Sequence, residues 1–326
     1  MARHRLSAYR GSMAWSASKG VDYLLRSSYD ASGKRVQHSL GRRSATTEVQ
    51  KQHFDEGRVL AQERMDAIRT ILNRQAAVNR AVALGRVPSL SARIMRAVDD
   101  AGLLGQGLRV AGTHALYAYE AIAGVFLDAA ITTTEDIDFL QDSRTSLRFS
   151  AAACVEDAGM IGLLKRIDKS FERGPQSYRA INKDGFFVDL IKPVPNPPWK
   201  PGVAPALAHD LEAIEIEGLA WLENAPSFEA VAIDATGMPC RIIAVDPRVF
   251  AAHKFWVSQR LDREPAKRMR DLAQARVVAA LATRYFSHLP YDADDLRMLP
   301  LAVFETAVPL FAARRMPDDI LAPEPD

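Results

Sequence analysis

The sequence contains little cysteine and no long hydrophobic run. Cys154 and Cys240 are the only cysteines among 326 residues, which excludes a small domain held together by disulfides. No stretch reaches the roughly 18 apolar residues that a membrane-spanning helix needs. The basic N-terminus also lacks the apolar segment of a secretory signal. We therefore expect a cytoplasmic protein with two reduced thiols and no membrane contact.

Several motifs of nucleotide-binding and hydrolytic enzymes are missing as well. No G-x-x-x-x-G-K-[ST] and no G-x-G-x-x-G occurs, so a P-loop or a Rossmann fold has no support. Neither a G-x-S-x-G elbow nor a His and Cys cluster with zinc spacing is present. The composition, with 48% hydrophobic and 25% charged residues, is typical of a globular chain and excludes a disordered one.

Charge is distributed unevenly along the chain. Residues 1–43 carry nine Lys or Arg and two Asp, a net charge of +7, whereas the whole chain has a formal net charge of +2. Residues 21–29 and 36–40 have the composition of strands and enclose turn residues at 30–33. The segment is therefore predicted to form a basic β-hairpin.

This basic segment mixes cations with aromatic rings, a combination that can bind a phosphate backbone and stack on a base. The candidate nucleic-acid contacts are Tyr23, Arg26, Lys34, Arg35, Arg42 and Arg43. Alternatively, the basic arm packs on the acidic remainder of the chain or on a second subunit.

Hydrophobic periodicity predicts an α/β (α+β) fold, in which helices flank a mixed β-sheet. The expected segments are a basic β-hairpin arm (1–43), a helical connector (44–88), an α/β core (89–245), a helical C-terminal domain (246–315) and a flexible tail (316–326).

Individual elements follow from the same pattern. Strands are expected at 108–111, 134–140, 162–167, 178–182, 186–191, 228–233 and 241–245. Helices are expected at 46–82, 91–104, 114–122, 145–157, 246–260, 265–284 and 292–314. Ser89 is expected to cap the helix at 91–104. Six prolines between 193 and 205 predict an extended loop.

The strongest chemical signal is the D-x-D motif of Asp136 and Asp138 on a predicted strand. Alternation of side chains places both carboxylates on one strand face. A divalent cation relieves the repulsion between two such charges, and Mg²⁺ and Mn²⁺ prefer oxygen ligands. The alternative is a hydrated strand edge without a ligand.

Two further features share this context. Upstream, Gly112 and Thr113 lie between a predicted strand and a predicted helix, where a backbone turn, a hydroxyl and a helix start can hold a phosphate oxygen. Downstream, Asp189 interrupts the apolar strand at 186–191, and a buried carboxylate is costly unless it is paired or bound to a metal. A plain loop and a paired core aspartate are the alternatives.

The order of these three features resembles the DNA polymerase β-type nucleotidyltransferase superfamily. Residues 110–120 and 133–140 most resemble stand-alone bacterial nucleotidyltransferase-like proteins, with abortive-infection-type nucleotidyltransferase toxins as more distant relatives. The resemblance spans about residues 90–285. Thr113 stands where serine is commoner in the superfamily, and it keeps the hydroxyl.

The resemblance implies a mechanism as well as a fold, with residues 89–245 as the catalytic core. Asp136 and Asp138 would hold two Mg²⁺ or Mn²⁺ ions against the phosphates of an NTP, and Asp189 would join them. Asp189 would also help to deprotonate the attacking hydroxyl, and attack on the α-phosphorus would release pyrophosphate. Gly112 and Thr113 would bind the nucleotide.

A second cluster lies in the helical C-terminal part. By resemblance, Lys254 is placed on the triphosphate and Arg268 at the nucleotide cleft. Arg268 and Asp271 are three residues apart on one predicted helix, so they can pair. The alternative is a set of surface ion pairs on amphipathic helices. His114, directly after Thr113, is expected near the phosphates in preference to a role as general base.

The expected activity is metal-dependent transfer of an NMP from an NTP to a hydroxyl. RNA or tRNA is the favoured acceptor, and a protein or a small molecule is an alternative. A non-catalytic nucleic-acid-binding protein on the same fold would also explain the basic arm, but it would not need an aspartate in an apolar strand. A toxin-like effector is a third interpretation. A homo-oligomer or a regulatory partner is compatible with each.

Overall fold

The computed structural model describes residues 8–9, 11–29, 34–144, 159–197, 199 and 210–312. The described residues form two compact units, one that ends at Val82 and one that begins at Ala83. Each unit is described on its own. None of the described helices is both long and apolar enough to cross a membrane.

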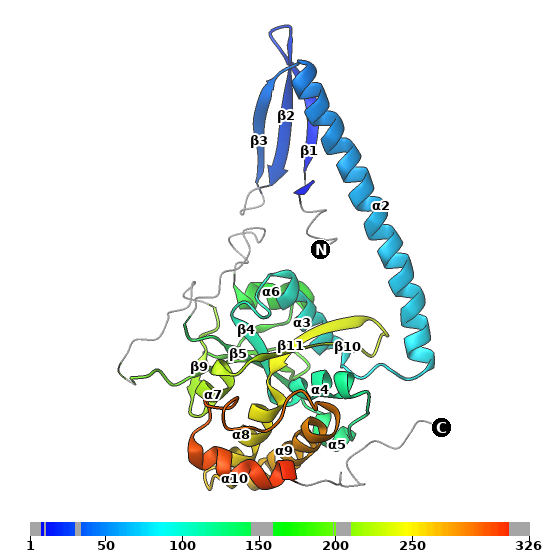
Figure 1. Ribbon diagram of the computed structural model, residues 1–326. Coiled ribbons are helices and arrows are strands. Elements are labelled where there is room, and N and C mark those ends of the chain that lie inside the picture. Colours follow the sequence, from blue (N-terminus) through cyan, green and yellow to red (C-terminus); the bar gives the residue numbers. More distant parts are fainter. Residues whose placement is uncertain are drawn as a thin grey trace. The chain divides into compact units, whose positions relative to one another are not determined.

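The first unit begins with a three-stranded antiparallel sheet in the order β1-β2-β3 (Figure 1). Its strands are β1 (Ser12–Ser18), β2 (Val21–Tyr29) and β3 (Arg35–Arg42). The predicted hairpin of β2 and β3 is confirmed, whereas β1 was not predicted because its serines and alanines have little strand propensity. Lys19 and Gly20 join β1 to β2 with φ of 50° and 75°, the positive angles of a tight hairpin turn.

A single long helix, α2 (Ala45–Ala81), follows the sheet and confirms the helix expected at 46–82. Ser44 and Thr47 form a reciprocal capping box, in which each side chain accepts a hydrogen bond from the other residue's backbone N–H. Phe54 is the large side chain that α2 buries, and it packs against the ring of Tyr9. One face of α2 thus holds the small sheet.

The second unit is built on an eight-stranded mixed sheet. The strand order is β10-β11-β4-β5-β8-β7-β6, and β9 also pairs with β8. Strand bounds are β4 (Leu108–Ala111), β5 (Asp136–Gln141), β6 (Glu172–Arg173), β7 (Arg179–Ile181), β8 (Phe187–Pro193), β9 (Ile214–Ile216), β10 (Ser227–Ile233) and β11 (Pro239–Val245). The β11–β4, β5–β8 and β8–β9 pairs are parallel, and the other pairs are antiparallel.

Helices cover this sheet. Their bounds are α3 (Ser89–Asp100), the 3₁₀ turn η1 (Gly112–Ala115), α4 (Leu116–Ala123), α5 (Ala129–Thr132), α6 (Met160–Ile167), α7 (Leu219–Asn224), α8 (Pro247–Gln259), α9 (Pro265–Tyr285) and α10 (Leu301–Ala312). In the view of Figure 1, α3 and α6 lie above the sheet, and α8, α9 and α10 lie below it. The predicted mixed α/β class, with C-terminal helices, is confirmed.

Several local predictions were wrong. Residues 162–167, expected as a strand, belong to helix α6, because Met160, Leu163 and Leu164 are buried at helical spacing. The carboxylate of Asp210 caps this helix by accepting hydrogen bonds from the backbone N–H groups of Met160 (2.8 Å) and Ile161 (3.0 Å). A cap that lies 50 residues away along the chain cannot be recognised by local pattern.

Other differences concern helix ends. Ser89 does not cap α3: it is the first helical residue, and Pro88 is the N-cap without a side-chain hydrogen bond. α3 ends at Asp100, short of the expected residue 104. The helix expected at 292–314 begins only at Leu301, since Pro300 disfavours helical backbone in the residue before it. The helix expected at 145–157 and most of the proline-rich loop at 193–205 lie outside the described residues.

Candidate active site

The three aspartates singled out in the sequence lie together on adjacent strands. Asp138 on β5 is the direct neighbour of Asp189 on the parallel strand β8. Asp136, two residues earlier on β5, shares the strand face of Asp138 because side chains alternate. Ile137 and Phe139 are fully buried on the opposite face. The strand pattern therefore gathers three carboxylates on one side of the sheet.

Gly112 brings the backbone against this group. β4 ends at Ala111, which pairs directly with Asp138, and the chain then turns into η1 with Gly112 at φ +59°. A Cβ atom at Gly112 would lie 2.0 Å from Oδ2 of Asp138, far inside contact distance. Glycine is the residue that combines this backbone angle with so close an approach. The Gly-Thr turn thus lies directly beside the carboxylates.

The carboxyl group of Asp138 has a strongly perturbed proton affinity. Burial, and then the negative charges of Asp136 and Asp189, raise its pKa to about 7. The positive charges of Lys254 and Arg179 act in the opposite direction and only partly compensate. The carboxyl group of Asp138 therefore keeps its proton to a higher pH than an ordinary aspartate does.

Asp189 is neutralised by Arg179, its direct neighbour on β7. The guanidinium donates from Nε to Oδ1 at 2.8 Å and from Nη2 to Oδ2 at 2.6 Å. It also lies 4.5 Å from the ring centroid of Phe187. The side chain of Asp189 is only 7% exposed, so this bidentate pair supplies the partner that a buried carboxylate needs.

The three aspartates provide the type of donor atom that a metal ion needs, but their side chains are not arranged around a metal position in this structure. In the described part of the chain, no three His, Cys, Asp or Glu side chains are arranged to hold a metal ion as they stand. Asp189 turns both oxygens to Arg179, and Asp136 accepts a hydrogen bond from the hydroxyl of Thr134. The oxygen-only donor set is nevertheless the type that Mg²⁺ and Mn²⁺ prefer, and the raised pKa of Asp138 indicates charge that a cation would relieve.

Lys254 on α8 is one of the cations that act on the aspartates. Its Nζ donates to Oδ1 of Asp271 at 2.7 Å, while Nε of Arg263 donates to Oδ2 at 3.0 Å. Its charge lowers the pKa of Asp138, so Lys254 lies within electrostatic reach of the three aspartates. The buried Asp271 thus orients a lysine beside the site.

The expected pair of Arg268 with Asp271 is not formed. Nε of Arg268 donates instead to the backbone carbonyl of Ser258 near the end of α8, at 2.9 Å. Asp271 is 2% exposed, and both of its oxygens accept from Lys254 and Arg263. Residues three apart on a helix can form an ion pair, but here Lys254 and Arg263, which lie outside α9, occupy both oxygens of Asp271. A contact of Arg268 with the nucleotide stays a prediction.

Two residues of α9 that the sequence did not single out contact the Gly-Thr turn. Nη2 of Arg270 donates to Oγ1 of Thr113 at 2.9 Å and to the carbonyl of Thr133 at 2.7 Å. Gln274 donates to the same Oγ1 at 3.2 Å. Both lie more than 150 residues from Thr113 along the chain, and the basic run around Arg270 was the one signal that could have indicated them.

His114 is the third residue of the turn η1, and its side chain is enclosed by the protein. Its Nε2 is 2.7 Å from Oγ of Ser91, and the side chain is almost completely buried. Burial is the largest of the effects that lower its pKa to about 4. Within the described residues its Nδ1 has no hydrogen-bond partner. A neutral, enclosed imidazole is suited to supporting the turn.

Comparison with known families agrees with this geometry. Residues 89–299 match a family model described as Nucleotidyltransferase. The chain belongs to this nucleotidyltransferase family. The matched residues contain all three aspartates, the Gly-Thr turn and the helices α8 and α9. No curated protein and no solved structure shows significant similarity to the chain.

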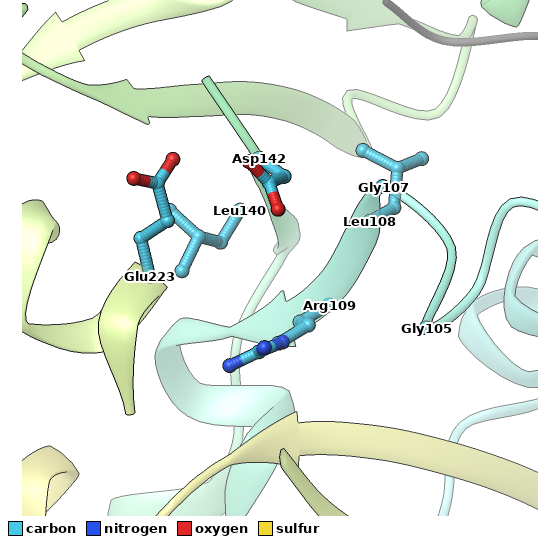
Figure 2. A pocket seen from close by; sticks show the side chains of 7 residues that line it. All are labelled: Gly105, Gly107, Leu108, Arg109, Leu140, Asp142 and Glu223. Carbon is cyan, nitrogen blue, oxygen red and sulfur yellow. The ribbon is translucent and has the colours of Figure 1, made fainter. Parts of the chain in front are cut away.

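The protein has a small cavity of about 40 Å³ at the other end of β4 and β5 (Figure 2). Its lining residues are Gly105, Gly107, Leu108, Arg109, Leu140, Asp142 and Glu223. Nη1 of Arg109 donates to the carbonyls of Ala225 (2.6 Å) and Leu222 (3.4 Å), at the C-terminal end of α7. Arg109 therefore stabilises the end of a helix, and the cavity is separate from the aspartates.

The basic residues of the first unit precede the part of the chain that matches the family. Arg43 forms ion pairs with Asp22 (3.3 Å) and Glu48 (2.9 Å), and Arg26 lies 5.2 Å from the ring centroid of Phe54. These two candidates help to hold the unit together. On or next to β3, the remaining cations are exposed: Lys34, Arg35 and Arg42, the last 6.0 Å from the ring centroid of Tyr23.

Proposed function

We propose that the protein transfers an NMP from an NTP to a hydroxyl acceptor and releases pyrophosphate, in a reaction that depends on Mg²⁺ or Mn²⁺. The observation that carries this proposal is the position of Asp138, which lies between Gly112 and Asp189 with a pKa raised to about 7. Such a carboxylate cluster beside a backbone turn is suited to a metal-bound phosphate chain.

Asp136 and Asp138 would hold the metal, and Asp189 would join them after Arg179 releases one or both of its oxygens. Bound divalent ions would neutralise the phosphates and stabilise the charge that develops during transfer. In the protein without ligands Arg179 holds both oxygens of Asp189, so the third carboxylate is positioned beside Asp138 before a cation binds.

The Gly-Thr turn would hold phosphate oxygens. Oγ1 of Thr113 accepts hydrogen bonds from Arg270 and Gln274, which occupy its acceptor positions and leave its own hydrogen free to donate. Lys254, oriented by Asp271, would supply a positive charge to the triphosphate. These groups bind and orient the nucleotide for in-line attack.

The chemical step is the formation of one P–O bond and the cleavage of another. The acceptor oxygen bonds to the α-phosphorus, the bond to the bridging oxygen breaks, and pyrophosphate leaves with that electron pair. The hydroxyl proton passes to a carboxylate, for which Asp189 is the candidate because it borders Asp138 on the next strand.

We favour RNA or tRNA as the acceptor. The exposed cations Lys34, Arg35 and Arg42, together with Tyr23, give the first unit groups that attract a phosphate backbone and stack on a base. A protein or a small-molecule hydroxyl remains the alternative outcome of the test.

The test is incorporation of label from each α-labelled NTP, with Mg²⁺ or Mn²⁺, into total RNA and total protein. Asp138→Asn should abolish incorporation, while Asp142→Asn, directly after the end of β5 and in the lining of the small cavity, should retain it. Equal incorporation by wild type and Asp138→Asn would refute nucleotidyl transfer at this site. Label found only in protein would exclude an RNA acceptor. RNA binding without NTP binding would favour a non-catalytic protein.

A further inference from the structure

The helix α2 of the first unit has a second set of apolar side chains, which are exposed among the described residues. Its packed face carries the buried residues Thr47, Phe54, Ala76 and Asn79. Outside this packed face, exposed apolar residues recur every 11 positions: Val49 (50% exposed), Leu60 (65%), Ile71 (63%) and Val82 (53%) at the C-cap. Eleven residues are close to three helical turns, so these four side chains form one stripe along the helix.

The rest of this stripe consists of Ala67, Val78 and charged or polar residues, all exposed. A solvent-facing helix surface is ordinarily polar, and most of the stability of a helix in a protein comes from packing of its apolar residues. The exposed apolar residues of this stripe therefore indicate that another protein surface covers them.

We propose that the stripe Val49–Leu60–Ile71–Val82 pairs with the same stripe of a second copy of this chain, with the two helices antiparallel. The stripe is symmetric about the midpoint between residues 65 and 66. An antiparallel pair centred there sets Val49 against Val82 and Leu60 against Ile71 of the other copy. Each of these four residues then meets an apolar residue of the other copy, and the residue pairs are repeated by the two-fold symmetry of the interface.

Charge favours the same orientation. Residues 45–66 contain five acidic and three basic residues, a net charge of −2, whereas residues 67–82 contain three arginines and no acid. Antiparallel pairing brings the acidic part of each helix against the basic part of the other. Glu56 would lie near Arg74 across the pair. A parallel pair would instead set like charges together at both ends.

The length of the stripe is sufficient for a specific contact. From Val49 to Val82 the helix extends about 50 Å, and a strip about 10 Å wide covers roughly 500 Å² per copy. The two copies together would bury about 1,000 Å², the lower limit for a specific interface. We therefore expect a dimer that dissociates on dilution into the micromolar range.

The first test is the oligomeric state of the full-length protein, measured by sedimentation velocity over a hundredfold concentration range without nucleotide. Wild type should shift from monomer to dimer, and Leu60→Glu/Ile71→Glu should stay monomeric. Leu301→Glu is the matched control, because Leu301 is a leucine of similar exposure (68%) on α10. A monomeric wild type, or a double variant that still dimerises, would overturn the proposal.

The second test determines the orientation by oxidative cross-linking. Val49→Cys and Val82→Cys are placed on separate full-length chains in a Cys154→Ala background; Cys240 is buried. Antiparallel pairing predicts rapid cross-linking of the mixture and little cross-linking of either variant alone. Efficient self-cross-linking of Val49→Cys would show parallel pairing and contradict the proposal. Loss of dimers when RNA is digested would show that nucleic acid holds the copies together.

Discussion

Arg179 and Asp189 face each other on adjacent strands and share two hydrogen bonds of 2.8 and 2.6 Å. Through this pair the guanidinium occupies both oxygens of the third carboxylate in the cluster. The charge of Arg179 also lowers the pKa of Asp138, although burial and the neighbouring carboxylates outweigh it. The pair therefore controls how much negative charge the site presents to a cation.

Replacing Arg179 should make the stability of the protein more dependent on metal. Arg179→Met keeps an aliphatic stem near Phe187 but leaves Asp189 buried and unpaired, which should lower the free energy of unfolding by about 3 kcal/mol without metal. Thermal unfolding with and without Mn²⁺ should show a larger stabilisation of the variant than of wild type. Arg173→Met, on the exposed strand β6, serves as the control. Equal shifts for all three proteins would contradict a metal at Asp189.

The raised pKa of Asp138 predicts a particular pH dependence in the metal-free protein. Between about pH 4 and 7 the folded state keeps a proton that the unfolded state has released. This group therefore lowers the free energy of unfolding as pH rises through that window, by at most about 1.4 kcal/mol per pH unit. Asp138→Asn removes the effect, so denaturant unfolding in EDTA should show the variant gaining on wild type from pH 5 to 7. A constant difference between the two proteins would show an ordinary pKa.

Arg270 should matter for nucleotide binding more than Arg268 does. Arg270→Lys removes Nη2, the guanidinium nitrogen that donates to both Oγ1 of Thr113 and the carbonyl of Thr133. A hydrogen bond from a charged group is worth about 1.5–3 kcal/mol. We expect KM for the NTP to rise at least about tenfold, with a smaller change in kcat. Arg268→Lys is the matched comparison on the same helix. A larger effect at Arg268 would support its predicted contact with the nucleotide. It would contradict the expectation, based on the contacts of Arg270 with Thr113 and Thr133, that Arg270 matters more.

Two histidines should remain neutral well below the usual pKa of imidazole. Burial is the main cause that lowers the pKa of His114 to about 4 and that of His253 to about 3. Side-chain ¹⁵N NMR should show both rings uncharged at pH 5.5, with His114→Gln and His253→Gln for assignment. Since the unfolded chain takes up these protons near pH 6.5, both residues lower stability as pH falls from there towards 4. An imidazolium signal from either ring at pH 5.5 would refute its burial.

The sequence pattern predicted the strands that carry the aspartates, whereas the resemblance to the nucleotidyltransferase superfamily implied that the three carboxylates act together. Asp136 and Asp138 alternate with Ile137 and Phe139, and Asp189 interrupts an apolar run, so each strand and its position for a carboxylate follow from local residues. In the structure β5 and β8 are adjacent parallel strands, and their register pairs Asp138 with Asp189.

The partners of these aspartates could not be predicted, since they depend on tertiary contacts. Arg179 lies on a strand of three residues, too short to show alternation. Arg270 reaches Thr113 across 157 residues of sequence, and Asp210 caps α6 from 49 or 50 residues away. In α6 the buried spacing of Met160, Leu163 and Leu164 was helical, but the short apolar run was also compatible with a strand.

The contact between Gly112 and Asp138 restricts how this chain can change over generations. A mutation to any other residue at position 112 would place a carbon 2.0 Å from the carboxylate that the site is built around. Thr113 next to it can become serine and keep its hydroxyl. Two adjacent positions in one turn thus differ in the substitutions they accept. Position 112 has room for a hydrogen atom only, whereas position 113 accepts either residue with an aliphatic hydroxyl.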